Sequence, residues 1–397
     1  MNRIFGNKIF IFLFLVFSFG FAHAELVTSD EFGYSIDFPE GFEIQDMSED
    51  QTIVVFSHSS LNLDVLLRAW PEGQFKNAKE AMNDTMKRLG AEFDTSEVEW
   101  RKQKCVVTNF KSAKLSERGI SIGWGAGVPV PEKKGILTVL AYSPESQAFD
   151  TEQMMISVLD AIFIDKGSFS EPGLITTLAF PSEGKKDVAL KIAGKSIKTT
   201  LDNVDSKASQ FLIDREFDVF KYYAATKSPL MYDAWIRFYR LIARDSLGRL
   251  KKASFDIWSA LQAESMKKDA LNPDAALAQI LLNWVQEFDY ERVSAKTDKA
   301  DFTNLPDVLA GRGSDCDSRS MLLAVILKNC GMDTCMFVSE IYSHAMFGIC
   351  LSDKEGQKIK VDDKEYLVGE TTAKNLTLGK IDAQMQDRSK WRAIEMY

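Results

Sequence analysis

The hydrophobic pattern changes its period part-way along the chain, and this change limits the folds that are available. Between residues 25 and 165, short stretches either alternate apolar and polar residues, as in FGYSIDFPEGFEI (32–44), or contain branched apolar residues that end at a turn. From about residue 205, apolar residues instead recur at i, i+3, i+4 and i+7. A period of two is typical of strands and a period of about 3.6 is typical of helices. The order predicts an α+β protein rather than alternating strand–helix–strand units.

Residues 25–166 are predicted to form a first domain, an α/β sandwich with helices packed on an antiparallel sheet. Its predicted helices cover 77–93, with Gly90 as the stop, and 151–164, with Thr151 as the N-terminal cap. The predicted strands cover 32–44 (with a Pro-Glu-Gly turn), 51–60, 61–70, 97–113, 119–130 and 135–143. The opening YSIDFPEGF, with this order of elements, resembles the PsbP-like domain family. The resemblance implies an accessory or binding role and no chemistry for this domain.

Residues 167–204 are predicted to be a linker followed by a hairpin. GSFSEPG (167–173) has the composition of a linker, and VALKIAGKSIKTTL (188–201) indicates two strands that turn at Gly194. Residues 205–397 should then form a helical layer plus a second domain. The layer's predicted helices cover 208–225, 230–246, 250–266 and 273–290.

The first 24 residues have the pattern of a signal peptide. Arg3 and Lys8 precede the apolar run IFIFLFLVFSFGF (9–21), and Ala22-His23-Ala24 supplies a cleavage site. A run of 13 is short for a membrane span, which needs about 20 residues. We therefore expect an exported protein, periplasmic or secreted, that does not span the membrane after cleavage. The alternative is that the segment stays attached as an uncleaved anchor.

Composition excludes several kinds of partner and site. The formal charge is −9, and no basic tract with interleaved aromatic residues is present, so we expect no nucleic-acid partner. The chain has three histidines, and His23 leaves with the signal peptide, so any histidine chemistry must use His58 or His344. With so few histidines and no Cys-x-x-Cys pair, no metal site is expected. Among the five cysteines, Cys330 and Cys335 are close enough in sequence to pair across a turn.

Cys316 is predicted to lie in the first turn of a buried helix. The segment LPDVLAGRGSDCDSRSMLLAVILKNCGM (305–332) indicates a turn, then a helix that is apolar nearly all round and stops at Gly331. Ser314 or Asp315 can cap its start. The unpaired N–H groups and the dipole at a helix N-terminus favour an anion, which would lower the pKa of a thiol there. We expect the flanking aspartates to point away, one capping the helix and one meeting solvent or a cation such as Arg319.

His344 and Glu370 supply the other two parts of a nucleophilic site. Predicted strands follow the helix at 333–341, 343–351, 357–363 and 365–373. His344 begins the second of these strands, and Glu370 lies near the end of the last. A thiol, a histidine and an acid that orients the imidazole form the arrangement that activates a cysteine nucleophile. Asp362 or Asp363 is an alternative acid.

The motifs SDCDSRSMLLAVILKNCGM, SHAMFGICL and EYLVGETTA, in this order, resemble the transglutaminase-like superfamily, which is related to papain. The resemblance covers about residues 275–375 and implies a helix packed on an antiparallel sheet. It also implies that Cys316 is the nucleophile, His344 the base and Glu370 the orienting acid. In this sequence Ser314 stands where the family usually has glycine, and the acid is Glu rather than the more frequent Asp.

We therefore expect an exported cysteine hydrolase that acts on a protein or peptide substrate, with no metal or organic cofactor. The backbone N–H of Cys316 would contribute to the oxyanion site, and Tyr290 is a candidate second donor. Transfer of the acyl group to an amine instead of water stays open. The rival hypothesis is a catalytically quiet transglutaminase-like module that binds or assembles proteins of the cell envelope.

Overall fold

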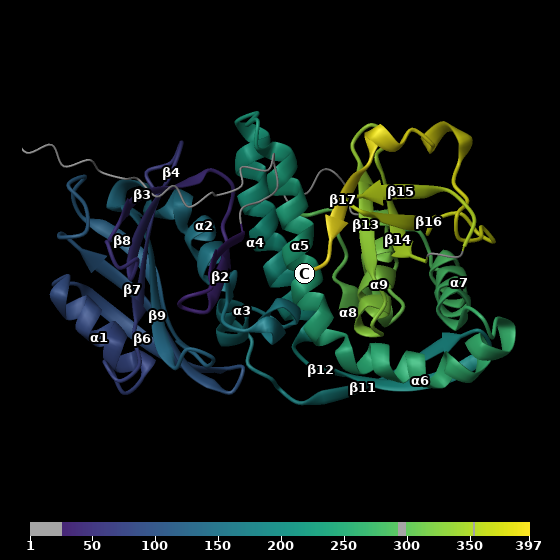
Figure 1. Cartoon of the computed structure of the whole chain (residues 1–397), viewed down its shortest axis with the longest axis horizontal. Helices are drawn as coiled ribbons and strands as arrows, with labels where there is room; N and C mark the ends of the chain where they lie inside the picture. Colours follow the sequence, from purple (N-terminus) through teal and green to yellow (C-terminus); the bar gives the residue numbers. More distant parts are fainter. Residues whose placement is uncertain (1–25, 293–298, 352–353) are drawn as a thin grey trace, which may run out of the picture.

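The computed structural model describes residues 26–292, 299–351 and 354–397. The predicted signal peptide and its cleavage site lie outside the described residues. The described chain combines helices with antiparallel sheets, which confirms the α+β prediction (Figure 1). Within the described part, no helix is both long enough and apolar enough to cross a bilayer.

The N-terminal part is built around a seven-stranded antiparallel sheet with the order β3-β4-β5-β9-β8-β7-β6. Along β9, successive side chains point to opposite faces, so Val139 packs against one helix layer and Leu140 against the other. This explains why the strand is apolar without alternation. The strands are β3 (Phe42–Met47), β4 (Ile53–His58), β5 (Asp64–Trp70), β6 (Glu92–Trp100), β7 (Gln103–Ser112), β8 (Ser121–Val130) and β9 (Gly135–Pro144).

Helices α1 (Ala78–Arg88) and α2 (Ala148–Asp160) cover the two faces of this sheet (Figure 1). The α1 helix stops as predicted, with Gly90 at φ +55°. The predicted start of α2 is wrong by three residues: Thr151 lies inside the helix, where its hydroxyl donates to the Gln147 carbonyl at 3.0 Å. A threonine can make this bond within a helix as well as cap one, so its residue type alone does not mark the first turn.

The predicted single strand 97–113 is wrong, because the chain reverses within it. Strands β6 and β7 pair antiparallel, with Trp100 opposite Gln103. Arg101 and Lys102 form the turn, with φ of +52° and +61°. Two-residue hairpin turns usually place Gly, Asn or Asp at such positions, so Arg-Lys gave no signal for this turn.

Residues 167–184 are packed rather than extended as a free linker. They contain the short helix α3 (Leu174–Ala179), whose Leu174 is fully buried. The first and last strands of the N-terminal part form a separate three-stranded sheet of β1 (Leu26–Ser29), β2 (Tyr34–Asp37) and β10 (Ile162–Phe163). The predicted hairpin is confirmed as β11 (Lys185–Ile192) and β12 (Lys195–Asp202), with Gly194 in its turn at φ +77°.

Helices α4 and α5 stand between the two large sheets, and α6 lies along the β11–β12 hairpin (Figure 1). The helices of this layer are α4 (Asp205–Ala225), α5 (Met231–Arg249), α6 (Lys251–Lys268), α7 (Pro273–Gln286) and α8 (Leu305–Leu309). Short 3₁₀ turns occur at Glu145–Gln147, Lys166–Ser170, Ala383–Met385 and Arg388–Lys390.

The C-terminal part packs helix α9 (Cys316–Asn329) against a five-stranded antiparallel sheet with the order β15-β16-β14-β13-β17. The run from Met321 to Leu327 is fully buried, as predicted, and Gly331 ends the helix at φ +88°. Strand β17 was not predicted from the sequence. The strands are β13 (Thr334–Ser339), β14 (His344–Cys350), β15 (Lys358–Val361), β16 (Lys364–Gly369) and β17 (Arg392–Glu395).

Helix α5 ties the two halves together through buried arginines. Arg240 pairs with Asp37 of β2, and Arg237 bridges Asp37 to Glu216 of α4. Arg244 donates to backbone carbonyls of the first domain, including that of Asp160 at 2.6 Å. A buried charge needs an opposite charge or hydrogen-bond partners of this kind to offset its lost hydration. The N-terminal domain is therefore anchored to the same helix that packs against α9.

Candidate functional site

The three predicted residues lie on neighbouring elements of the C-terminal part. Cys316 begins α9, His344 begins β14, and Glu370 directly follows β16. Helix α9 packs against β14, and β14 pairs with β16 with Phe347 opposite Gly369. These contacts bring residues that are far apart in sequence to one end of the sheet.

His344 and Glu370 form a close pair. Nε2 of His344 lies 2.7 Å from Oε2 of Glu370, and Glu370 is only 4% exposed. The other carboxylate oxygen accepts hydrogen bonds from the backbone N–H and hydroxyl of Thr372, at 2.7 and 2.6 Å. Because the carboxylate accepts from Nε2–H, Nδ1 is left as the ring nitrogen that can take a proton.

The ionisation of Glu370 is favoured by its partners. Burial alone would raise the pKa of this carboxyl, but the hydrogen bond and charge of His344, together with the hydrogen bonds from Thr372, hold its pKa below the usual range. An ionised acid at this position fixes the imidazole ring and stabilises its protonated form.

Asp362 and Asp363, the alternative acids, lie elsewhere. Both are exposed in the turn between β15 and β16, at the opposite end of β16 from Glu370. Asp362 takes a φ of +49° in this turn, which is the role that Asp commonly has in tight hairpins. The acid beside His344 is therefore Glu370.

Asp315 caps helix α9, as one of the two predicted candidates. Its carboxylate accepts the backbone N–H of Ser318 at 2.9 Å. Burial and the neighbouring Asp317 raise the pKa of Asp315 to about 7. One backbone N–H of the first turn, that of Ser318, is thus already hydrogen-bonded within the protein.

Cys316 itself differs from the prediction in one respect. Cys316 is 7% exposed, and its thiol donates a hydrogen bond to Oδ1 of Asp317 at 3.3 Å. Burial, Asp317 and Asp315 together raise the pKa of Cys316 above its ordinary value, and the backbone N–H of Ala345 acts in the opposite direction. The expected lowering by the helix terminus is therefore wrong for this resting state, because burial and two carboxylates outweigh it.

The expected place of the second aspartate is also wrong. Asp317 meets neither solvent nor Arg319; its Oδ2 accepts the hydroxyl of Tyr239 on α5. Arg319 instead donates to the carbonyl of Phe288 at 2.9 Å and to Ser314 Oγ at 3.2 Å. Arg319 therefore holds the start of α9 against the loop after α7. It does not form an ion pair with Asp317.

Other residues near the site were not singled out by the sequence. The ring of Trp391 lies 6.3 Å from that of His344 in an edge-on arrangement. Tyr239 is 78 residues before its hydrogen-bond partner Asp317, and Trp391 is 47 residues after His344, so no local motif could have connected them. Tyr290, the candidate oxyanion donor, is 56% exposed and lies on the segment that pairs with Ser314.

His58 belongs to the first domain's core. It ends β4, is buried, and its Nδ1 accepts the backbone N–H groups of Ser60 and Leu61 at 3.2 and 3.0 Å. Burial lowers the pKa of His58 to about 4. His58 is therefore a buried histidine whose Nδ1 is hydrogen-bonded within its own loop.

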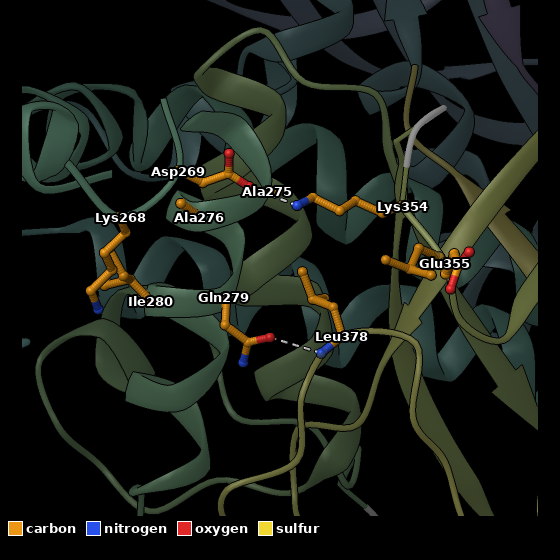
Figure 2. A pocket seen from close by; sticks show the side chains of 10 residues that line it. Lys268, Asp269, Ala275, Ala276, Gln279, Ile280, Lys354, Glu355 and Leu378 are labelled. Carbon is orange, nitrogen blue, oxygen red and sulfur yellow. Dashed lines mark hydrogen bonds and ion pairs between the residues drawn. The ribbon is translucent and has the colours of Figure 1, made fainter. Parts of the chain in front are cut away.

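A separate cavity of about 300 Å³ lies between α7 and the segment after β14 (Figure 2). Two interactions join its walls: Lys354 Nζ lies 2.7 Å from Asp269 Oδ2, and the Leu378 N–H donates to Gln279 Oε1 at 2.8 Å. Cys316, His344 and Glu370 are not among the residues that line it.

No protein-family model matches the chain, and no curated protein matches it either. Among solved structures, the N-terminal part is similar to the cyanobacterial PsbP protein of Synechocystis sp. PCC 6803, at 11% identity over 37% of this chain and 95% of that one, with a TM-score of 0.31. The Ran-binding protein Mog1p of Saccharomyces cerevisiae matches at 11% identity, 34% and 92% coverage and a TM-score of 0.26. A protein from Bacteroides thetaiotaomicron VPI-5482 matches at 9% identity, 84% and 88% coverage and a TM-score of 0.22.

Proposed function

We propose that the chain is an exported cysteine hydrolase or acyl transferase of transglutaminase-like type, with Cys316 as nucleophile, His344 as base and Glu370 as orienting acid. The observation that carries this proposal is the buried 2.7 Å pair of His344 and Glu370. The next residue after His344 is Ala345, whose backbone N–H acts on the Cys316 sulfur. A histidine oriented by a carboxylate, on a strand that packs against the helix of the thiol, supplies the parts needed for nucleophilic catalysis.

The chemical steps follow from these positions. The S–H bond of Cys316 breaks, its proton passes to Nδ1 of His344, and the sulfur attacks the carbonyl carbon of an amide. The tetrahedral oxyanion is bound by the backbone N–H of Cys316, with the Tyr290 hydroxyl as a second donor. Collapse of this intermediate forms a thioester, and His344 gives its proton to the leaving amine. Water or a second amine then takes the acyl group.

The substrate is proposed to be a protein or peptide, because an amide carbonyl is the electrophile that such a site handles. The first domain, with its proposed PsbP-like character, would bind substrate or a partner and contribute no catalytic group. Its buried histidine is consistent with this division, since His58 Nδ1 is already occupied by two backbone N–H groups.

The proposal is tested by labelling the full chain with a peptide vinyl sulfone, and mapping the modified residue by mass spectrometry. We expect modification at Cys316, no modification there in Cys316→Ser, and a rate at least tenfold lower in His344→Ala. Labelling of Cys316 that is unchanged by His344→Ala would refute the enzyme hypothesis. The unmodified Cys330, which is half-buried, serves as an internal reference thiol.

A second candidate is a catalytically quiet binding or assembly module. The observation that favours it is the hydrogen bond of the Cys316 thiol to Asp317, a carboxylate that opposes ionisation of the sulfur. Under this hypothesis the vinyl sulfone reacts with Cys316 no faster than with a small-molecule thiol, in the wild-type chain and in His344→Ala alike.

A further inference from the structure

The Cys316 thiol lies at the end of a chain of hydrogen bonds that begins on helix α5. Tyr239 donates its hydroxyl to Oδ2 of Asp317, and Oδ1 of the same carboxylate accepts the thiol hydrogen. Tyr239 is 4% exposed, and its ring is packed against those of Phe238 and Phe302 at 5.0 and 6.0 Å. The hydroxyl is therefore held in one place, and it holds the carboxylate in one orientation.

We propose that Tyr239 and Asp317 are positioning residues that keep the resting Cys316 thiol protonated, so that the thiolate forms only when the proton passes to His344. This inference rests on the proposed function, because it describes the regulation of the same thiol. In the resting arrangement the proton is on sulfur, and Oδ1 of Asp317 accepts it in a hydrogen bond. On activation the S–H bond breaks, the electron pair stays on sulfur, and Nδ1 of His344 takes the proton.

The charges around the pair support this direction. From α9 itself Asp315 adds a second carboxylate, and Asp301, from the segment before α8, adds a third that acts on Asp317. Arg292 is paired with Asp301, and Tyr290 faces the site from the same loop. The imidazole of His344, held by Glu370, begins β14 and acts electrostatically on Asp317; it is the base of the proposed function.

The nearest arginine on the helix does not neutralise Asp317. The guanidinium of Arg319 donates its hydrogen bonds to Ser314 Oγ and to the carbonyls of Phe288 and Thr371. Burial raises the pKa of Asp317, and the hydrogen bonds from the Tyr239 hydroxyl and the Cys316 thiol act in the opposite direction. A hydrogen bond that stabilises the carboxylate also favours the state in which the shared proton is on sulfur.

The test is the pH profile of Cys316 alkylation by iodoacetamide in the full chain, between pH 5 and 10, read by mass spectrometry of the Cys316 peptide. Asp317→Asn should react about tenfold faster at pH 7, because loss of the carboxylate lowers the thiol pKa by about one unit. Tyr239→Phe should react about threefold faster, because the carboxylate loses its donor. In both variants the midpoint of the profile should move to lower pH, which a merely structural role would not cause.

Tyr232→Phe is the matched control. Tyr232 lies on the same helix and its hydroxyl also binds a carboxylate, that of Glu340. Its alkylation profile should superimpose on that of the wild-type chain. An equal shift in this control, or unshifted profiles in Asp317→Asn and Tyr239→Phe with native circular dichroism, would overturn the inference. If Asp317→Asn does not fold, Tyr239→Phe decides alone.

The two hypotheses fail in different ways. If His344→Ala leaves the vinyl sulfone reaction of Cys316 unchanged, the proposed function fails. If His344→Ala slows that reaction while Asp317→Asn and Tyr239→Phe keep the wild-type alkylation profile, the enzyme hypothesis stands and only the role of Tyr239 and Asp317 is refuted.

Discussion

Nη2 of Arg240 lies 2.7 Å from Oδ1 of Asp37, an ion pair that joins residues 203 positions apart in the chain. Asp37 is fully buried at the end of β2, and Arg237 and the hydroxyl of Tyr397 also bind it. Helix α5 thus carries the arginines that hold the first domain and, on the same helix, the Tyr239 that binds Asp317. The placement of the first domain and the geometry around Cys316 therefore share one rigid element.

Asp37→Ala should lower the free energy of unfolding by about 3–5 kcal/mol, because it leaves Arg240 without its carboxylate and leaves the buried Arg237 with Glu216 alone. Urea denaturation followed by circular dichroism measures this loss. The matched control is Asp94→Ala, which removes an exposed carboxylate of β6 and should change stability by less than about 0.5 kcal/mol. A loss below 1 kcal/mol in Asp37→Ala would contradict a role of this pair in joining the halves.

The stability of the wild-type chain should also fall in acid because of Asp37. Burial opposes ionisation of this carboxyl, but Arg240 and Arg237 hold its pKa below the usual range. The stabilisation is present above the unfolded pKa of about 3.9 and is lost as the pH falls through the lower folded value. Urea unfolding at pH 6 and pH 3 should show a smaller difference in Asp37→Ala than in the wild-type chain.

Glu40→Gln should stabilise the chain at alkaline pH. Burial raises the pKa of Glu40 to about 8, with Asp37 and Asp233 acting in the same direction and Arg237 against it. The unfolded carboxyl ionises near pH 4 while the folded one stays protonated, so the wild-type chain loses stability as the pH rises from about 4 to 8. The gain in Glu40→Gln should reach a few kcal/mol above pH 8.

Urea unfolding of the wild-type chain and Glu40→Gln at pH 5 and pH 9 measures this gain. The control is Glu43→Gln, which changes an exposed carboxylate of β3. We expect no difference between the two pH values for this control relative to the wild-type chain. An equal stability of Glu40→Gln and wild type at pH 9 would show that Glu40 ionises freely in the fold.

Glu370→Gln should reduce the His344-dependent reaction of Cys316 with the vinyl sulfone by about a hundredfold or more, because a neutral amide neither stabilises the imidazolium nor selects the Nε2–H tautomer. Asp363→Asn, in the exposed turn after β15, should react at the wild-type rate. The opposite result, with Asp363→Asn impaired and Glu370→Gln active, would assign the orienting acid to the turn and contradict the observed pair.

All five cysteines are free thiols in the structure, including Cys330 and Cys335. Titration of the unfolded, unreduced chain with a chromogenic disulfide should therefore count five thiols. Fewer than five would reveal a disulfide, and mapping of the linked peptides would identify it. The sequence left this open, because a short spacing between cysteines does not establish the geometry that a disulfide needs.

Elements with strong periodicity were predicted well from the sequence. Residues 188–201 form a hairpin around Gly194, and the apolar segment after Cys316 forms a buried helix. The turn at Arg101 and Lys102 was missed, because neither residue type favours a positive φ. Strand β17 was missed because four residues carry too little pattern, and pairing with β13 decides its conformation.

The sequence by itself determined which side chains could take part in the proposed chemistry. Once the apolar N-terminal segment is set aside, it leaves two histidines, and it places one of them between a helix-starting cysteine and a later acid. The tertiary structure decided which acid meets His344, because strand pairing and not spacing brings Glu370 within 2.7 Å. It also decided the resting state of the thiol. Asp317 and Tyr239 meet only because α5 packs against α9, and the pKa of a thiol depends on the burial and charges that such packing creates.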